Sequence, residues 1–130
     1  MAEPTQAPRD SGSLGTGVLD PRAFERFSAE KATVMRVYGD QDVSVVVWNL
    51  EPGQENPLHV HQESAHAIIV LEGSGESLQA DAPPVPIKEG ECIIVPRGRT
   101  HGVRNSGRGR LAYLAVTTLR EAGYVRDARA

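Results

Sequence analysis

The sequence predicts an all-β fold in which a single domain forms a closed or double-sheet antiparallel barrel. The first observation is a series of short apolar segments between Thr33 and Leu119, separated by turn residues. The second is the number of residues that favour turns: 13 glycines and 9 prolines interrupt the 130 residues at frequent intervals. This pattern is typical of antiparallel barrels. The third is the length, which suits one hydrophobic core.

The N-terminal segment has few large apolar side chains to bury. Residues 1–17 are rich in Pro, Ser, Gly and Thr, so we expect a flexible arm, which packing on a partner subunit could order. Residues 18–130 are then expected to form the domain. Asp20 and Pro21 are a suitable N-cap and first helical residue. They predict a short helical turn up to about Phe27 that presents Phe24 and Phe27 to one end of the barrel.

From Thr33 onward the pattern alternates between strands and turns. The segment from Val43 to Leu50 is apolar on both faces, as expected for a strand with the barrel interior on one side and further packing on the other. The proline-rich link 82–86 is unsuited to a central strand, and residues 121–130 form a polar tail that could be helical. Strands are predicted at residues 33–38, 43–50, 66–71, 76–80 and 92–95, from residue 101 onward, and at 110–119.

The chain has four histidines, and all of them fall within residues 53–73 and 90–105. His59 and His61 are two residues apart, so on an extended strand their rings share a face and are close enough to share one ion. His66 follows at an odd offset, and it reaches that face only if the polar stretch 62–65 turns the chain into a second strand. His101 opens a strand after a Pro-x-Gly turn. The four imidazoles are therefore expected to converge.

The two histidine segments resemble the paired motifs of the cupin superfamily. In the first motif a glycine is followed after five residues by His-x-His and later by a second glycine, and the matching residues are Gly53, His59, His61 and Gly73. The second motif combines a glycine, a Pro-x-Gly turn, a histidine and an asparagine, and the matching residues are Gly90, Pro96, Gly98, His101 and Asn105. The first motif also contains a glutamate. Here His66 takes that position, because Glu63 is out of register.

The resemblance covers roughly residues 33–119 and implies a cupin-type antiparallel β-barrel, also described as a double-stranded β-helix or jelly roll. It implies one metal site with the ligands His59, His61, His66 and His101. It indicates little about the reaction, because cupins host many activities. Neutral imidazoles suit several transition metals. The expected cofactor is therefore one divalent transition metal ion, with Fe, Mn, Zn, Ni and Cu left open.

The replacement of glutamate by His66 changes the electrostatics of such a site. Four neutral ligands leave a divalent ion with a formal charge of about +2, where a carboxylate ligand would reduce it to about +1. The site should therefore favour anionic oxygen ligands such as enolates, carboxylates or hydroxide. It also lacks the carboxylate that serves as general base in flavonol-cleaving cupins. A mechanism in which the metal lowers the pKa of the substrate or of water is favoured.

Three functions are compatible with these motifs. The first is a metal-dependent oxidoreductase of dioxygenase type that acts on an anionic small molecule. The second is a redox-neutral lyase or isomerase, and the third is a non-catalytic module that binds a small molecule. Oxygen consumption separates the first from the second, and saturable binding without turnover supports the third. The candidate substrate-binding residues are Arg97, Arg99, Trp48 and Tyr113, with Tyr38 as a further candidate for the pocket lining.

Other side chains near the histidines could hold the rings by hydrogen bonds to their second nitrogen. The nearest in sequence are Gln62, Glu63, Ser64 and Asn105. Backbone carbonyls are at least as suitable, and Asn105 is expected rather to cap a turn. Cys92 lies in an apolar strand, so we expect its thiol to be buried and inert.

Composition argues against several classes of partner. The chain has 14 Lys and Arg against 17 Asp and Glu, and because the basic residues are dispersed, nucleic-acid binding is disfavoured. No apolar run approaches the roughly 20 residues of a membrane span, and the N-terminus lacks the features of a signal peptide. We therefore expect a cytoplasmic protein, and its one cysteine suits a reducing compartment. An apolar strand face formed by Ala67, Ile69 and Leu71 predicts a homodimer.

Overall fold

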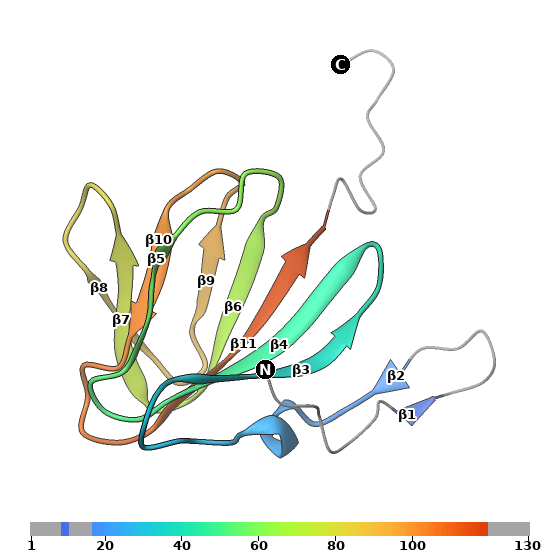
Figure 1. The fold of residues 1–130 in the computed structure, drawn as a ribbon, viewed down its shortest axis with the longest axis horizontal. Helices are drawn as coiled ribbons and strands as arrows, with labels where there is room; N and C mark the ends of the chain where they lie inside the picture. Colours follow the sequence, from blue (N-terminus) through green and yellow to red (C-terminus); the bar gives the residue numbers. More distant parts are fainter. Residues whose placement is uncertain (1–8, 11–16, 120–130) are drawn as a thin grey trace, which may run out of the picture.

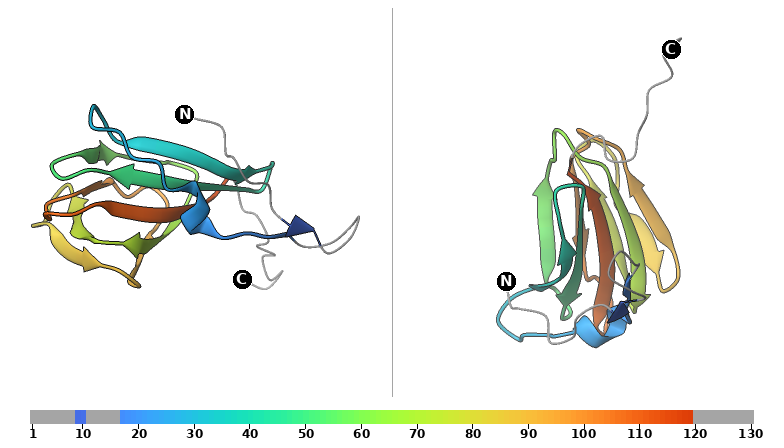
Figure 2. Two further views of the ribbon diagram at one scale, coloured as in Figure 1. Left: turned by 90° about the horizontal axis from the view of Figure 1, so that it is seen from below. Right: turned by 90° about the vertical axis from the view of Figure 1, so that its right-hand side faces the viewer.

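The structure, a computed structural model, describes residues 9–10 and 17–119, and it consists mainly of two antiparallel β-sheets that face each other (Figures 1 and 2). This arrangement confirms the predicted all-β barrel. Most of the expected N-terminal arm and the whole tail 120–130 lie outside the described residues. Within the described part of the chain, no helix is long and apolar enough to span a membrane.

The two sheets have five and four strands. The five-stranded sheet has the order β3-β4-β11-β6-β9, and the four-stranded sheet has the order β5-β10-β7-β8. Two short strands near the N-terminus, β1 (Arg9–Asp10) and β2 (Gly17–Val18), pair with each other. The larger sheet contains β3 (Thr33–Gly39), β4 (Val43–Leu50), β6 (His66–Glu72), β9 (Cys92–Val95) and β11 (Leu111–Thr118). The smaller sheet contains β5 (Glu55–His59), β7 (Ser74–Gln79), β8 (Val85–Lys88) and β10 (His101–Arg104).

The predicted strand limits agree with the structure to within a few residues. The predictions for β4 and β9 match at both ends. Part of the proline-rich link becomes β8, which includes Pro86 and lies at the edge of its sheet. An edge position tolerates proline because one side of the strand needs no hydrogen-bond donor. β5 ends at His59, so His61 lies beyond the strand that was expected to carry both residues.

The main core lies between the two sheets. Strand pairing aligns Tyr113 with Trp48 on one side and with Val70 on the other, which places these three side chains on the inner face. The same alternation places Ala115 and Thr117 on that face. Fully buried Leu50, Leu111 and Val103 complete the closed end of the core.

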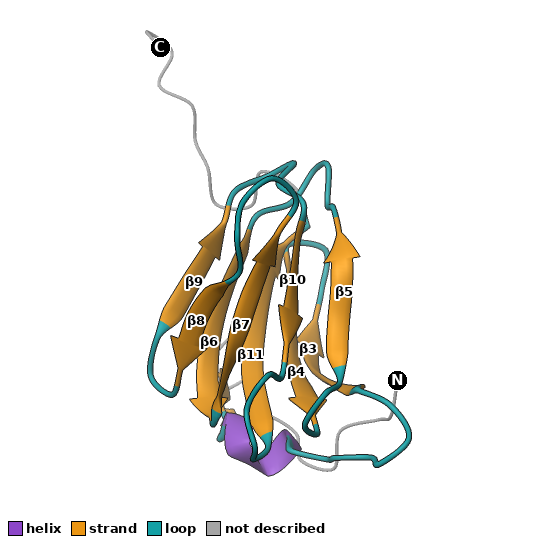
Figure 3. Ribbon diagram, turned by 90° about the vertical axis from the view of Figure 1, so that its left-hand side faces the viewer, coloured by secondary structure: helices purple, strands orange, loops and turns teal. Residues whose placement is uncertain are grey.

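A short 3-10 helix, η1 (Pro21–Phe24), covers the end of the barrel opposite the histidines (Figure 3). The predicted N-cap is confirmed, because the Asp20 side chain accepts a hydrogen bond from the Arg22 backbone N–H at 3.0 Å. The helix ends at Phe24 rather than Phe27, because the backbone of Glu25 is extended. Phe24 is fully buried in a second cluster with Met35, Val37 and Val47.

The outer face of the five-stranded sheet is only partly covered. The expected apolar face of Ala67, Ile69 and Leu71 is half-buried. Pairing of β6 with β9 sets Cys92 beside Ile69 and Ile94 beside Ala67. The prediction that Cys92 is buried is wrong, because its thiol is exposed on this outer face. β9 is an edge strand, so an apolar sequence there does not ensure that both faces are covered.

Candidate metal centre

Three of the four histidines lie at strand ends in the two sheets and His61 lies in a loop, all at the end of the barrel where β5 ends and where β6 and β10 begin, the upper end of these strands in Figure 3. His59 is the last residue of β5 and His101 is the first residue of β10, and the two strands pair these residues in register. His66 is the first residue of β6 in the opposite sheet. His61 lies in the loop between β5 and β6. The polar residues 62–65 therefore turn the chain from one sheet to the other, as the odd spacing of His66 requires.

The distances between the rings are those of side chains that share one small site. Imidazoles bound to one ion through nitrogens about 2.1 Å away have centroids roughly 4.5 Å apart when neighbouring and roughly 6.3 Å apart when opposite. The centroids of His61 and His66 are 4.2 Å apart, and those of His59 and His101 are 4.3 Å apart. The His59–His61, His66–His101 and His61–His101 distances are 4.9, 5.0 and 6.0 Å.

The four imidazole rings are close together, but their orientations do not point the donor nitrogens at one common position. In the described residues, no group of three or more His, Cys, Asp or Glu side chains is already arranged to hold an ion. The ring planes are inclined to one another by 34° to 82°. Rotation about χ2, which is soft for histidine, reorients a ring without moving the strand that carries it. The backbone therefore sets the spacing, and the donor atoms need only local adjustment.

Hydrogen bonds at Nδ1 leave the other ring nitrogen available. His59 Nδ1 lies 2.7 Å from the Pro57 carbonyl oxygen. A carbonyl can only accept, so Nδ1 carries a proton, and in the neutral tautomer with that proton Nε2 is the nitrogen with the free lone pair. His101 Nδ1 makes a longer contact of 3.4 Å with the Arg99 carbonyl. His66 Nδ1 lies 2.7 Å from the hydroxyl oxygen of Thr117, and donation to that oxygen leaves Nε2 of His66 free as well.

The groups that contact the rings are two backbone carbonyls and Thr117. In the described contacts, none of the four side chains proposed from the sequence hydrogen-bonds a histidine ring: Gln62, Glu63, Ser64 and Asn105. Thr117 was not identified from the sequence, because it contacts His66 only through the pairing of β11 with β6. The available signal was a polar residue at an inner position of the last strand, in alternation with Tyr113 and Ala115.

His66 gives the strongest indication that the site holds a cation. Its Nε2 is buried and has no hydrogen-bond partner among the described residues. Burial, together with the neighbouring histidines, lowers the pKa of His66 to about 4. Burial also lowers the pKa of His61 and of His101. These imidazoles are therefore neutral near pH 7, and neutral imidazole is the form that binds a metal. The donor set fits a divalent transition metal ion.

A cavity of about 290 Å³ adjoins the histidines between the two sheets. Trp48 and Tyr113 form one wall, with ring centroids 6.3 Å apart and planes inclined by 15°. The Tyr113 hydroxyl accepts a hydrogen bond of 3.1 Å from the Asn56 side chain, and burial raises the pKa of Tyr113. No Asp, Glu, Lys or Arg of the described chain lines this cavity. Its polar groups, other than the histidines, are therefore uncharged near pH 7.

The remaining candidate residues lie elsewhere. Arg99 lines a second, larger cavity, which meets the first at His101. Arg97 is exposed in the same turn and lines neither cavity. Tyr38 is also exposed, and its hydroxyl donates to Asp40 Oδ2 at 2.7 Å. The suggestion that Tyr38 lines the pocket is therefore wrong.

The motif glycines and asparagine connect the two histidine segments. The Gly98 N–H donates to the His61 carbonyl at 2.9 Å, which ties the Pro-x-Gly turn to the loop that holds His61. At the other end of the barrel, the Gly53 N–H donates to the Asn105 carbonyl at 2.8 Å. The predicted turn cap is confirmed, because the Asn105 side chain accepts from the Gly107 N–H and donates to the Leu50 and Gly109 carbonyls.

The fold and the two motifs together define a cupin. The family model of the cupin domain matches residues 46–117, which is more than half of the chain, and the chain belongs to this family. The oxalate-binding protein of Thermotoga maritima is 33% identical over 70 residues, or 54% of this chain and 57% of that protein. The match thus spans little more than half the length of that relative.

Solved structures with similar folds cover more of the chain. A conserved protein with a double-stranded β-helix domain from Klebsiella pneumoniae has a TM-score of 0.74 and 29% identity, over 83% of this chain and 94% of that chain. The polyketide cyclase RemF from Streptomyces resistomycificus has a TM-score of 0.63 and 26% identity, over 76% of this chain and 72% of that chain.

Proposed function

We propose that this cupin is a metal-dependent enzyme of dioxygenase type that acts on a small anionic molecule. The observation that carries the proposal is a cluster of four imidazoles beside a cavity without charged side chains among the described residues. An anionic substrate inside that cavity has no side-chain cation of the described lining to bind. A bound dication would supply the attraction instead.

The residues that would hold the metal are His59, His61, His66 and His101. When bound, a redox-active ion such as iron or copper would supply oxygen chemistry and would lower the pKa of a substrate hydroxyl. Three Nδ1 contacts fix the rings of His59, His66 and His101 so that the second nitrogen is the one available. His66 completes the set with a neutral ligand, so no protein carboxylate reduces the charge of the centre.

The cavity walls suggest which substrates fit. Trp48 and Tyr113 offer a flat aromatic surface, and a space of about 290 Å³ suits a molecule of one or two rings. Asn56 can hydrogen-bond a substrate oxygen with the amide hydrogen that does not bond Tyr113. Because no carboxylate lines the cavity in the described chain, proton removal from the substrate depends on a lowered substrate pKa rather than on an Asp or Glu base.

A redox-neutral lyase or isomerase reaction is the second candidate. The similarity to a polyketide cyclase supports it, because a bound ion could also polarise a substrate oxygen in a reaction without oxygen uptake. A non-catalytic module that binds a small carboxylate is the third, and the similarity to an oxalate-binding protein supports it. The three candidate functions use the same four histidines as metal ligands. They differ in the metal that is bound and in whether a substrate is converted.

Metal analysis of the native protein tests this proposal. The protein is purified without added metal, its metal content is measured, and oxygen uptake is followed with enolate-forming or phenolic substrates. Iron or copper near one ion per chain, with oxygen uptake lost in His101→Ala, is the expected result. Zinc with substrate turnover but no oxygen uptake would establish the redox-neutral alternative. A protein that binds no divalent metal would overturn the metal centre.

A further inference from the structure

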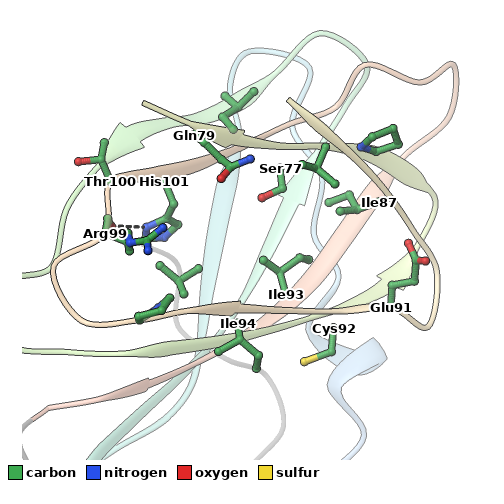
Figure 4. A pocket seen from close by; sticks show the side chains of 15 residues that line it. Ser77, Gln79, Ile87, Glu91, Cys92, Ile93, Ile94, Arg99, Thr100 and His101 are labelled. Carbon is green, nitrogen blue, oxygen red and sulfur yellow. Dashed lines mark hydrogen bonds between the residues drawn. The ribbon is translucent and has the colours of Figure 1, made fainter. Parts of the chain in front are cut away.

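We propose that the barrel has a second ligand site, distinct from the metal centre, that binds an amphipathic monocarboxylate. The site is the cavity of about 540 Å³ that lies beside β7, β8 and β9 (Figure 4). β8 and β9 are the edge strands of the two sheets, and they do not pair with each other. The sheets therefore separate at this side of the barrel and leave an opening of a size typical for small ligands.

The body of this cavity is apolar. Ile87 and Val95, both less than 10% exposed, contribute to its lining. Ile93 points into the cavity from β9, whereas its neighbour Ile94, which also belongs to the lining, directs its side chain to the other side of the strand (Figure 4). An aliphatic chain in this space would remove apolar surface from water on both the protein and the ligand.

One end of the cavity is polar and positive. Arg99 lies beside His101 at this end, Gln79 points into the cavity nearby, and Ser77 points into it further along, toward Ile87 (Figure 4). The Arg99 guanidinium has no hydrogen bond or ion pair with any described residue, so it is free to bind a ligand. A planar guanidinium matches a carboxylate with two parallel hydrogen bonds.

The other end of the cavity selects against a second negative charge. Glu91 lies there, far from Arg99 in Figure 4, and its carboxylate accepts a hydrogen bond of 2.9 Å from the Lys88 backbone N–H. A dicarboxylate that filled the cavity would bring its second charge close to Glu91. One anionic head and an uncharged tail therefore fit the charge distribution best.

The two cavities can be distinguished experimentally. His101 lines both, but Trp48, the only tryptophan of the chain, lines the metal-side cavity alone. A ligand beside Arg99 should leave the fluorescence of Trp48 nearly unchanged, and a ligand beside the other histidines should alter it. Binding to the second site should also be independent of metal.

The test is a titration of the full-length, metal-free protein with decanoate, followed by calorimetry and by Trp48 fluorescence. We expect saturable binding with a 1:1 stoichiometry, at least about tenfold weaker binding of decanol, and little change in fluorescence. Arg99→Gln should weaken decanoate binding by about tenfold, the loss expected for a charge-assisted pair, and the matched Arg97→Gln should not. The Ile93→Phe side chain should fill the cavity and prevent decanoate binding. The Ile94→Phe variant, altered on the outer side of the same strand, should bind decanoate as tightly as the wild type does.

Each outcome decides the proposal. Equal affinity for decanoate and decanol, or no effect of Arg99→Gln, would show an apolar cleft without a carboxylate site and would overturn it. Binding that alters Trp48 fluorescence and is lost in His61→Ala would place the ligand at the histidines and would also overturn it. If Ile93→Phe does not fold, the surface pair Arg99→Gln and Arg97→Gln is sufficient. None of these results depends on whether the protein binds a metal, so the two proposals fail separately.

Discussion

At the scale of single residues, His66 would determine the charge of the proposed metal centre. It begins β6, and its inner neighbours on the adjacent strands are Thr117 and Val95. It has one polar contact, to Thr117, and one buried nitrogen without a partner among the described residues. A buried polar atom without a partner is costly unless a ligand satisfies it. A role of His66 as a metal ligand and a role in packing alone therefore predict different effects when His66 is replaced.

The substitution His66→Glu separates those two roles. If His66 is a ligand, glutamate restores the usual cupin ligand, so the protein should stay folded and metal content should stay equal or rise. Substrate affinity should fall, because the carboxylate reduces the charge of the centre. If His66 only fills space, the new carboxylate lies in a buried position without a partner. The protein should then lose about 3–5 kcal/mol of stability with unchanged metal affinity. Metal content and melting temperature decide between these outcomes.

Thr117 is predicted to position the ring of His66. Thr117→Val keeps the shape of the side chain but removes the oxygen 2.7 Å from His66 Nδ1. Loss of such a contact typically lowers metal affinity by about 10–100-fold, with only a small change in fold stability. Competition with a metal chelator measures the change. Thr118→Val is the neighbouring control, because the Thr118 hydroxyl accepts from the Ala65 N–H and contacts no histidine ring. Equal losses in both variants would exclude a specific role for Thr117.

At the scale of elements, the turn between β9 and β10 connects the two halves of the centre. Gly98 adopts a φ of 79° in this turn, a conformation that other residues enter only with strain. Its N–H bonds the carbonyl of His61, which belongs to no strand. His61 is therefore the histidine whose position depends most on this turn.

Gly98→Ala is predicted to weaken the centre through His61. The strain should cost about 1–2 kcal/mol of stability, and displacement of the turn should lower metal affinity. Gly109→Ala is a matched control, because a Cβ at either glycine meets no atom within 4 Å and only Gly98 has a positive φ. Denaturant unfolding and metal titration of both variants test the prediction. A Gly98→Ala protein as stable as Gly109→Ala would contradict it.

At the scale of the whole molecule, the end of the barrel opposite the histidines carries a pH-dependent contact. Burial, followed by a hydrogen bond with Glu72, raises the pKa of Glu25 to about 7, although Arg22 opposes the shift. An acid whose pKa is raised in the folded state stabilises that state by staying protonated. This contribution is fully present below about pH 4.5 and is lost as the pH rises through about 7.

Glu25→Gln, which imitates the protonated acid, should remove this dependence. Compared with the wild type it should be roughly 1–2 kcal/mol more stable above pH 7, after allowance for solvent screening. The difference should disappear toward pH 4.5. Urea unfolding of both proteins between pH 4.5 and 8 measures it, because the pH effects of groups that do not interact with Glu25 cancel in the comparison. A constant difference at all pH values would contradict the prediction.

The homodimer expected from the sequence stays a prediction. The half-buried outer face of Ala67, Ile69 and Leu71 continues onto β9, where Ile94 is 67% exposed. An apolar face of this kind favours association with a second copy. Sedimentation at micromolar concentration should show a dimer that Ile94→Glu converts to monomer and Ile94→Val preserves. A monomer in the wild type, unchanged by removal of residues 1–16, would rule it out.

The sequence by itself determined the fold and the segments that carry the site. Alternating apolar residues and glycine and proline turns are local signals, so they indicated the strands that became β3, β4, β6, β9 and β11. The odd spacing of His66 required a turn before it, and the structure has that turn. The prolines of the link 82–86 excluded only a central strand, and β8 accordingly lies at the edge of its sheet.

The tertiary structure decided every feature of the site that depends on the pairing of particular strands. Thr117 reaches His66 only because β11 pairs with β6, a contact between residues 51 positions apart. Arg99 lies close to His101 in sequence but lines only the larger cavity, because the two sheets separate beside β8 and β9. Cys92 is exposed because its apolar strand lies at a sheet edge. Strand alternation assigns a residue to one of two faces, and only the packing of the sheets determines what covers each face.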